Sequence, residues 1–144
     1  IEESQAKKIL YISGYEKSYV TRSRLQGVKE VALENGVELV VKDADFLEEK
    51  AEEVAVQYGR DVDAIVCASD LMALGAQSAM KKLHLEKPIC GFDGISLMGY
   101  VGQGIYTIGQ NFSQISAIAM EELHRLMMGE MGQIIEVEYS LIKN

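Results

Sequence analysis

Proline, cysteine and basic residues are scarce in this chain, and each shortage excludes a class of protein. The 144 residues include one proline and two cysteines. A single proline, without repeats or low-complexity tracts, argues against a disordered tail. No Cys-x-x-Cys motif or histidine cluster indicates a metal site, and isolated thiols fit a reducing cytosol. We therefore expect one cytoplasmic domain with no bound metal or cofactor.

The charge balance and the lack of long apolar runs exclude two kinds of partner. The chain has 14 Lys and Arg against 22 Asp and Glu, which gives a formal net charge of −8. Such a chain does not suit the phosphate backbone of nucleic acid. No apolar run approaches the roughly 20 residues that a membrane-spanning helix requires. We predict that this chain itself contacts neither nucleic acid nor membrane.

Strand and helix patterns alternate along the first two thirds of the chain. Apolar runs predict strands over residues 8–13, 37–41, 64–68 and 88–93. Amphipathic patterns predict helices between them, over about 20–34, 47–58 and 70–83. This alternation is typical of an α/β fold, a three-layer sandwich in which helices cover both faces of a mostly parallel sheet.

The pattern changes after Gly94, where the sequence becomes rich in glycine and poor in charge. A fifth strand is predicted over 105–108, a helix over 113–128 and an alternating strand over 134–142. The helix is expected to bury five apolar residues, which are Ile115, Ala119, Leu123, Leu126 and Met127. This part is either a decoration of the domain or a segment that leaves the lobe and returns to it.

Each of the four expected parallel strands ends at a polar residue. Ser13, Asp43, Ser69 and Asp93 close or directly follow the apolar runs. In open α/β sheets, ligands bind outside the carboxyl ends of the strands, so these ends outline a polar pocket. Asp93 is the most informative of them, because a carboxylate that ends a buried strand needs a partner to offset its desolvation.

Two further residues lie just beyond these strand ends. Arg24 is near the start of the first helix, where a guanidinium can hold a pair of oxygens with parallel donors. The alternative is a surface arginine paired with an acid. Phe46 follows the second strand, and an apolar ring beside carboxylates suits a sugar pocket. A hydrophobic staple onto the next helix explains Phe46 equally well.

Two roles are expected for Ser69 and Asp70, which follow the third predicted strand: capping the next helix and contacting a ligand. Asp70 is expected to cap the helix over 70–83, with a ligand contact as the alternative. Ser69 lies one residue nearer the pocket and could donate to a ligand.

The sequence offers no catalytic residue. Asp43, Asp70 and Asp93 could hold Mg²⁺ in an enzyme, which is the alternative interpretation. The first strand ends without an acid, no phosphate-binding glycine loop is present, and no nucleophile, base and orienting group assemble. We therefore do not expect an enzyme.

Four motifs occur in a fixed order and carry a resemblance to a known family. They are Arg24-Leu25-Gln26-Gly27, the run AIVCASDLMALG over residues 64–75, Ile89-Cys90-Gly91-Phe92-Asp93-Gly94, and Thr107-Ile108-Gly109-Gln110-Asn111-Phe112. Together they closely resemble the effector-binding region of the lactose/galactose-repressor (LacI/GalR) family of transcription regulators. The resemblance covers essentially the whole chain, with a looser likeness to maltose-operon repressors.

The resemblance implies a two-lobed fold like that of type I periplasmic sugar-binding proteins. Residues 1–144 would be a fragment of the effector-binding domain, namely its C-terminal lobe. The segment over about 94–130 would cross to an N-terminal lobe outside this chain. The family implies a small-molecule sugar effector, a homodimer, and operator DNA bound only through a helix-turn-helix head outside the chain. A periplasmic-type sugar receptor for transport is the alternative, since it shares the fold.

The resemblance also implies roles for individual residues. The effector-binding positions would be Arg24, Phe46, Ser69, Asp93, Gln110 and Phe112. Arg24 and Asp93 match the charged residues that hold the effector's hydroxyls, although Asp93-Gly94 replaces the double carboxylate common in the family. The dimer-interface positions would be Leu74, Leu97, Met98 and Tyr100, with an ordinary core role as the alternative for all four.

Overall fold

The structure, a computed structural model, describes residues 5–144 and contains one six-stranded sheet in the order β2-β1-β3-β4-β5-β6. The strands are β1 (Lys8–Ser13), β2 (Glu38–Asp43), β3 (Ala64–Cys67), β4 (Ile89–Asp93), β5 (Ile105–Gln110) and β6 (Tyr139–Lys143). The first five pair in parallel, and β6 is antiparallel to β5. The predicted α/β fold with a mostly parallel sheet is confirmed.

Four helices belong to the main body of the structure, and α1 has clear start and stop signals in the sequence. They are α1 (Tyr19–Glu34), α2 (Glu48–Tyr58), α3 (Asp70–Leu83) and the short α4 (Met98–Val101), with a 3₁₀ turn over Gly59–Asp61. Ser18 caps α1 by accepting from the Thr21 amide, and α1 stops at Asn35 before Gly36, whose φ is +64°. Gly36 meets that conformation at no steric cost, which explains why the helix ends there.

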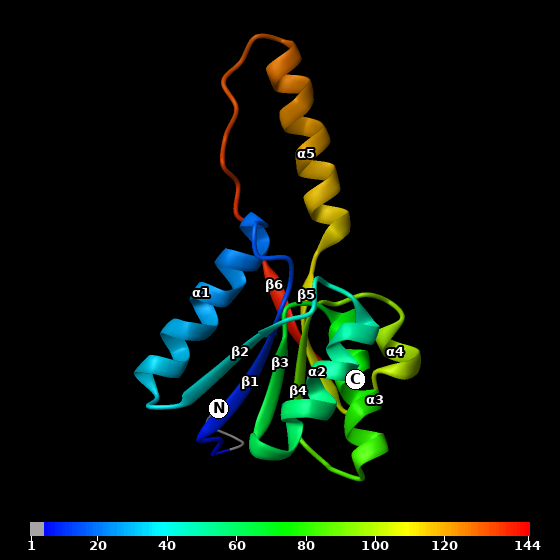
Figure 1. Cartoon of the computed structure of the whole chain (residues 1–144). Coiled ribbons are helices and arrows are strands. Elements are labelled where there is room, and N and C mark those ends of the chain that lie inside the picture. Colours follow the sequence, from blue (N-terminus) through cyan, green and yellow to red (C-terminus); the bar gives the residue numbers. More distant parts are fainter. Residues whose placement is uncertain (1–4) are drawn as a thin grey trace.

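Helices lie on both faces of the sheet, which makes three layers (Figure 1). In Figure 1, α1 lies on one side beside β1 and β2, whereas α2, α3 and α4 lie on the other. The core between the sheet and α2 and α3 includes Leu10, Ile12, Ile65 and Met72, which are all fully buried. Helices α2 and α3 contact each other closely at Gly75, where a Cβ would come within 2.2 Å of the Glu48 carbonyl oxygen. Small side chains let the two helices approach closely over the sheet.

The last helix does not pack as the sequence predicted. Helix α5 (Phe112–Met127) has no buried residue and extends away from the sheet, as Figure 1 shows. The expected burial of Ile115, Ala119, Leu123, Leu126 and Met127 is therefore wrong; Met127 is 76% exposed. The amphipathic spacing of α5 correctly predicts an apolar stripe on one side of the helix. Within residues 5–144, only the segment over residues 129–138, which returns from α5 to the sheet, lies beside that stripe.

The closing strand is also shorter than predicted. Residues 129–138 return from α5 to the sheet without regular structure, and β6 begins only at Tyr139. The alternating sequence over 134–138 resembles a strand, but no neighbouring strand among residues 5–144 pairs with it. The backbone of a strand needs such a partner, so alternation alone did not decide the structure.

In the part of the chain that is described, no helix combines the length and apolar character needed to span a membrane.

Candidate functional site

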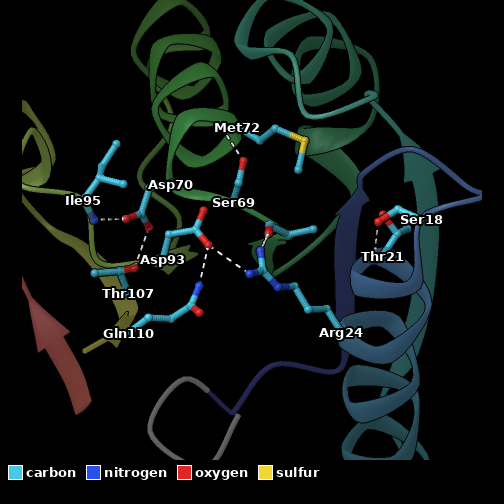
Figure 2. Close-up of polar contacts among 11 residues, drawn as sticks. Ser18, Thr21, Arg24, Ser69, Asp70, Met72, Asp93, Ile95, Thr107 and Gln110 are labelled. Carbon is cyan, nitrogen blue, oxygen red and sulfur yellow. Dashed lines mark hydrogen bonds and ion pairs between the residues drawn. The ribbon is translucent and has the colours of Figure 1, made fainter. Parts of the chain in front are cut away.

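The polar ends of the parallel strands lie along one edge of the sheet, as the sequence predicted. Ser13 at the end of β1 is in register with Asp43 at the end of β2, and Asp93 ends β4 beside Gly109 of β5. The sheet order places the end of β3 between β1 and β4. Side chains from α1, α3, β4 and β5 meet at this edge (Figure 2).

Arg24 and Asp93 form the centre of this arrangement. The Nη2 atom of Arg24 donates to Oδ1 of Asp93 at 2.9 Å, and its Nη1 atom donates to the carbonyl oxygen of Ala68. The guanidinium lies over the ring of Phe92, 3.8 Å from the ring centroid. The Arg24 and Asp93 side chains are only 16% and 25% exposed. Three contacts therefore fix the plane of a largely buried guanidinium.

Gln110 joins the same carboxylate from β5. Its Nε2 atom donates to Oδ1 of Asp93 at 2.9 Å. Both of these bonds, from Arg24 and from Gln110, are made to Oδ1 of the carboxylate. Burial raises the pKa of Asp93, while the charge and hydrogen bond of Arg24 act in the opposite direction.

The capping roles of Ser69 and Asp70 are the reverse of those predicted. Ser69 is the N-cap of α3, with extended φ and ψ, and its hydroxyl accepts from the Met72 amide at 3.3 Å. Asp70 is instead fully buried in the first turn, and its carboxylate accepts from Thr107 Oγ1 and from the Ile95 amide. The prediction that Asp70 caps the helix is therefore wrong, because Ser69 already satisfies that amide.

Phe46 lies close to the carboxyl ends of the strands, beside Gly14, which directly follows β1. It is partly buried, has a left-handed φ of +62°, and packs against the main core. Its ring lies directly over Gly14, where a Cβ would come within 2.1 Å of the ring. Phe46 is thus at the predicted edge, and its role in flanking a sugar stays a prediction.

The two remaining predicted binding residues, Ser69 and Phe112, lie near the same edge of the sheet. Ser69 directly follows Ala68, whose carbonyl holds Arg24. Phe112 is the first residue of α5, two residues after Gln110, and is 48% exposed. Arg24, Asp93 and Gln110 are therefore brought together, whereas ligand roles for Ser69 and Phe112 remain predictions.

One predicted dimer-interface residue belongs to the core. Met98 is only 2% exposed and is a member of the main core cluster, so the prediction that it faces a partner is wrong. It is the first residue of α4. Leu74 is partly buried against the same core, whereas Leu97 and Tyr100 are 45% and 87% exposed. Partner contacts by Leu74, Leu97 and Tyr100 stay predictions.

Sequence reasoning missed three residues that organise this edge. Phe92 lies under the guanidinium of Arg24, and Thr107 and Ile95 bond to Asp70. Thr107 carried a signal, since a hydroxyl within an otherwise apolar strand needs a buried partner. The Ile95 contact uses a backbone amide, for which the side-chain sequence gives no signal.

A cavity of about 430 Å³ lies beside this cluster rather than on it. It is lined by Ser13, Glu16, Lys17, Thr21, Arg22, Leu25 and Asp43. Because it includes neither Arg24 nor Asp93, we locate the candidate site by the converging polar groups. Within residues 5–144, no three His, Cys, Asp or Glu side chains are grouped to hold a metal ion.

No family model matches the chain. Among curated proteins, the chain is 32% identical over 138 residues to the HTH-type transcriptional repressor CytR of Escherichia coli, covering 89% of the chain and 40% of CytR. It is 29% identical over 124 residues to the ribose operon repressor of Halalkalibacterium halodurans, covering 81% of the chain and 38% of that protein. The chain thus spans well under half the length of these relatives.

Solved structures share the fold at lower sequence identity. A dimeric Lac repressor with a C-terminal deletion superposes with a TM-score of 0.90 at 21% identity, over 99% of this chain and 56% of that chain. A periplasmic solute-binding protein of an ABC transporter from Actinobacillus succinogenes, with bound D-allose, gives a TM-score of 0.84 at 23% identity, over 94% and 51%. The solved structures show that the chain shares their fold, and the sequence relatives show that it belongs to the LacI family of transcriptional regulators.

Proposed function

We propose that this chain is the ligand-sensing region of a LacI-type transcription regulator, in which Arg24, Asp93 and Gln110 hold the hydroxyls of a small sugar. The observation that carries the proposal is the convergence of a guanidinium, a carboxylate and an amide at the carboxyl edge of a parallel sheet. Sugar hydroxyls both donate and accept hydrogen bonds, so a pocket that recognises them needs fixed groups of both kinds.

Each group of the cluster has a distinct task in this proposal. Oδ2 of Asp93 accepts from one hydroxyl, while Arg24 donates to a neighbouring oxygen. Phe92 keeps the guanidinium in its plane, and Gln110 orients the carboxylate from the opposite side. Phe46 and Phe112 would cover the apolar faces of the sugar ring, and Ser69 would add a polar contact. The pocket is therefore held ready before the ligand arrives.

The rest of the pocket would come from a second lobe outside this chain. We propose that residues 94–130 cross to that lobe in the intact protein and that the chain then returns to the present sheet through β6. The absence of buried residues in α5, which extends away from the sheet in Figure 1, supports this assignment. A sugar that bridges both lobes would favour a closed arrangement and so change the equilibrium between two states of the protein.

The relatives' names support the regulatory part of the proposal. CytR is an HTH-type transcriptional repressor, and the other relative represses a ribose operon. We propose that the intact protein is a cytoplasmic homodimer and binds operator DNA through a helix-turn-helix head outside residues 1–144. None of the relatives reported above is an enzyme, so catalysis has no support from them.

A periplasmic-type sugar receptor for transport is the second candidate, because the neighbour with bound D-allose shares the fold. The reading frame upstream of Ile1 distinguishes the two. A basic helix-turn-helix head supports the regulator, whereas a secretory signal supports the receptor.

Calorimetry on the protein encoded by the complete reading frame tests the sugar proposal directly. We expect one sugar among D-ribose, D-allose and maltose to bind, and Arg24→Ala to weaken that binding by about tenfold or more, because a hydrogen bond to a charged group contributes roughly 1.5–3 kcal/mol. Lys50→Ala, which removes only an exposed ion pair with Asp45, should leave binding unchanged. Residues 1–144 alone should bind the same sugar weakly or not at all, and tight binding by this chain would refute the need for a second lobe.

A further inference from the structure

A buried carboxylate lies directly behind the candidate site. Asp70, in the first turn of α3, has no exposed surface. Its Oδ1 atom accepts from Thr107 Oγ1 at 2.5 Å, and its Oδ2 atom accepts from the Ile95 amide at 2.9 Å (Figure 2). The carboxylate thus connects α3 with β5 and with the turn after β4.

The sheet leaves space for this carboxylate. Gly91 of β4 and Thr107 of β5 are register partners, and Asp70 lies over this pair. A Cβ at Gly91 would come within 2.4 Å of Asp70 Oδ1. Burying a carboxylate is costly unless both oxygens find donors, and here each oxygen has one. The arrangement therefore has a specific geometry that an apolar side chain could not reproduce.

Both partners of Asp70 lie next to residues of the candidate site. Ile95 is two residues after Asp93, and Thr107 is three residues before Gln110. The turn between Asp93 and Ile95 is strained at Asp93, whose φ is +122°, whereas Gly94 adopts its φ of +71° at no steric cost. A non-glycine residue keeps such a φ only when its surroundings fix it. The bond from the Ile95 amide to Asp70 holds the far end of that turn.

The third group of the site is connected to the same helix end. Arg24 donates to the carbonyl of Ala68, which is two residues before Asp70. The start of α3 therefore contacts Arg24 through Ala68, the Asp93 turn through Ile95, and the strand of Gln110 through Thr107.

We propose that Asp70 is a positioning residue of this site: its carboxylate fixes the turn that carries Asp93 and the strand that carries Gln110. The inference rests on the proposed sugar-binding function for its biological meaning, although the geometry is testable without a sugar. If the Asp70 bonds are lost, the turn at Asp93 relaxes and the amide of Gln110 no longer meets Oδ1.

The test compares three variants of β5. Thr107→Val removes the hydroxyl that bonds to Asp70, Thr107→Ser keeps it, and Ile105→Val loosens the core on the same strand and face without touching Asp70. We expect Thr107→Val to weaken sugar binding by the complete protein about fivefold or more, the equivalent of about one lost hydrogen bond. Thr107→Ser should bind as the unaltered protein does. Ile105→Val should also bind normally, although it lowers the urea midpoint.

A ligand-free measurement by nuclear magnetic resonance on residues 1–144 separates this inference from the proposed function. The Ile95 amide should exchange with solvent far more slowly than the amides of exposed residues, and the Gln110 side-chain amide resonance should move only in Thr107→Val. Rapid exchange at Ile95 in the unaltered chain would overturn the inference even if no variant folds, as would an unmoved Gln110 resonance in a folded Thr107→Val. Normal results here with no sugar bound by the complete protein would instead count against the proposed function alone.

Discussion

Arg24 on α1 and Asp93 at the end of β4 form an ion pair of 2.9 Å, although 69 residues separate them in the sequence. The pair connects the helix on one face of the sheet to the central strands. Gln110 reaches the same oxygen of Asp93, so three elements converge on one carboxylate. This convergence distinguishes the edge of the sheet from an ordinary polar surface, and it has consequences for stability as well as for binding.

Breaking this pair should destabilise the chain. Arg24→Ala leaves a largely buried carboxylate with Gln110 as its remaining partner, and we expect a loss of about 1–3 kcal/mol in the free energy of unfolding. The exposed pair between Lys50 and Asp45 provides the control, and Lys50→Ala should cost under about 1 kcal/mol. Urea denaturation of both variants measures the two losses, and equal losses would contradict a structural role for the Arg24 pair.

The pH dependence of stability should carry the signature of Asp93. Burial raises its pKa in the folded chain. Between the ordinary aspartate pKa and this raised value, the folded state binds the proton more tightly than the unfolded state. The contribution of Asp93 to stability is therefore largest at low pH and falls as the pH rises through this window. Urea denaturation at several pH values measures this contribution as the free energy of unfolding of the unaltered chain minus that of Asp93→Asn. We expect this difference to fall as the pH rises.

Asp63 provides a control of opposite sign. Its carboxylate accepts from the backbone amides of Lys7 and Lys8, and these bonds hold its pKa below the ordinary value. Its contribution is present above the ordinary pKa and is lost as the pH falls through the lowered one. The difference between the unaltered chain and Asp63→Asn should therefore grow with pH, and parallel slopes for the two variants would contradict our assignment.

The two cysteines should be protected to different degrees in the folded chain. Cys67 is buried in the core and Cys90 is partly buried, and burial raises the pKa of both thiols. Because the thiolate is the reactive form, we expect a thiol reagent at neutral pH to modify Cys90 slowly and Cys67 more slowly still. Both should react at once in urea. Rapid modification of Cys67 without denaturant would show that the core opens more readily than this packing implies.

Met98 and Tyr100 should respond very differently to truncation, although they are two residues apart. Met98 is almost fully buried and Tyr100 is 87% exposed. We expect Met98→Ala to cost about 2–5 kcal/mol, from the lost burial and the cavity left behind. Tyr100→Ala should change stability by under about 0.5 kcal/mol. Thermal or urea unfolding of the two variants checks this, and a large loss for Tyr100→Ala would place Tyr100 in an unrecognised contact.

The sequence predicted those features that depend on local patterns along the chain. The first strand was assigned with its bounds, and the polar strand ends placed Arg24 and Asp93 at one edge, because parallel strands necessarily bring their carboxyl ends together. The sequence analysis assigned the N-cap of α3 to Asp70, whereas the structure shows that Ser69 is the cap. Both types of residue cap helices, and only the backbone conformation decides which one does.

The errors arose where burial depends on partners that the sequence does not specify. The apolar stripe of α5 has the spacing of a core helix, yet its residues are exposed in this chain. The prediction that Met98 faces a partner was wrong for the converse reason, because its side chain is buried in the core of this chain. The contact of Asp70 with the Ile95 amide was beyond prediction because it depends on a strained turn.

The most direct test of the central claim is a crystal structure of the complete protein with whichever sugar it binds. Our account predicts that sugar hydroxyls lie within hydrogen-bond distance of Asp93 Oδ2 and of the Arg24 guanidinium, with the ion pair between them intact. A sugar bound elsewhere, with neither side chain touching it, would contradict the account.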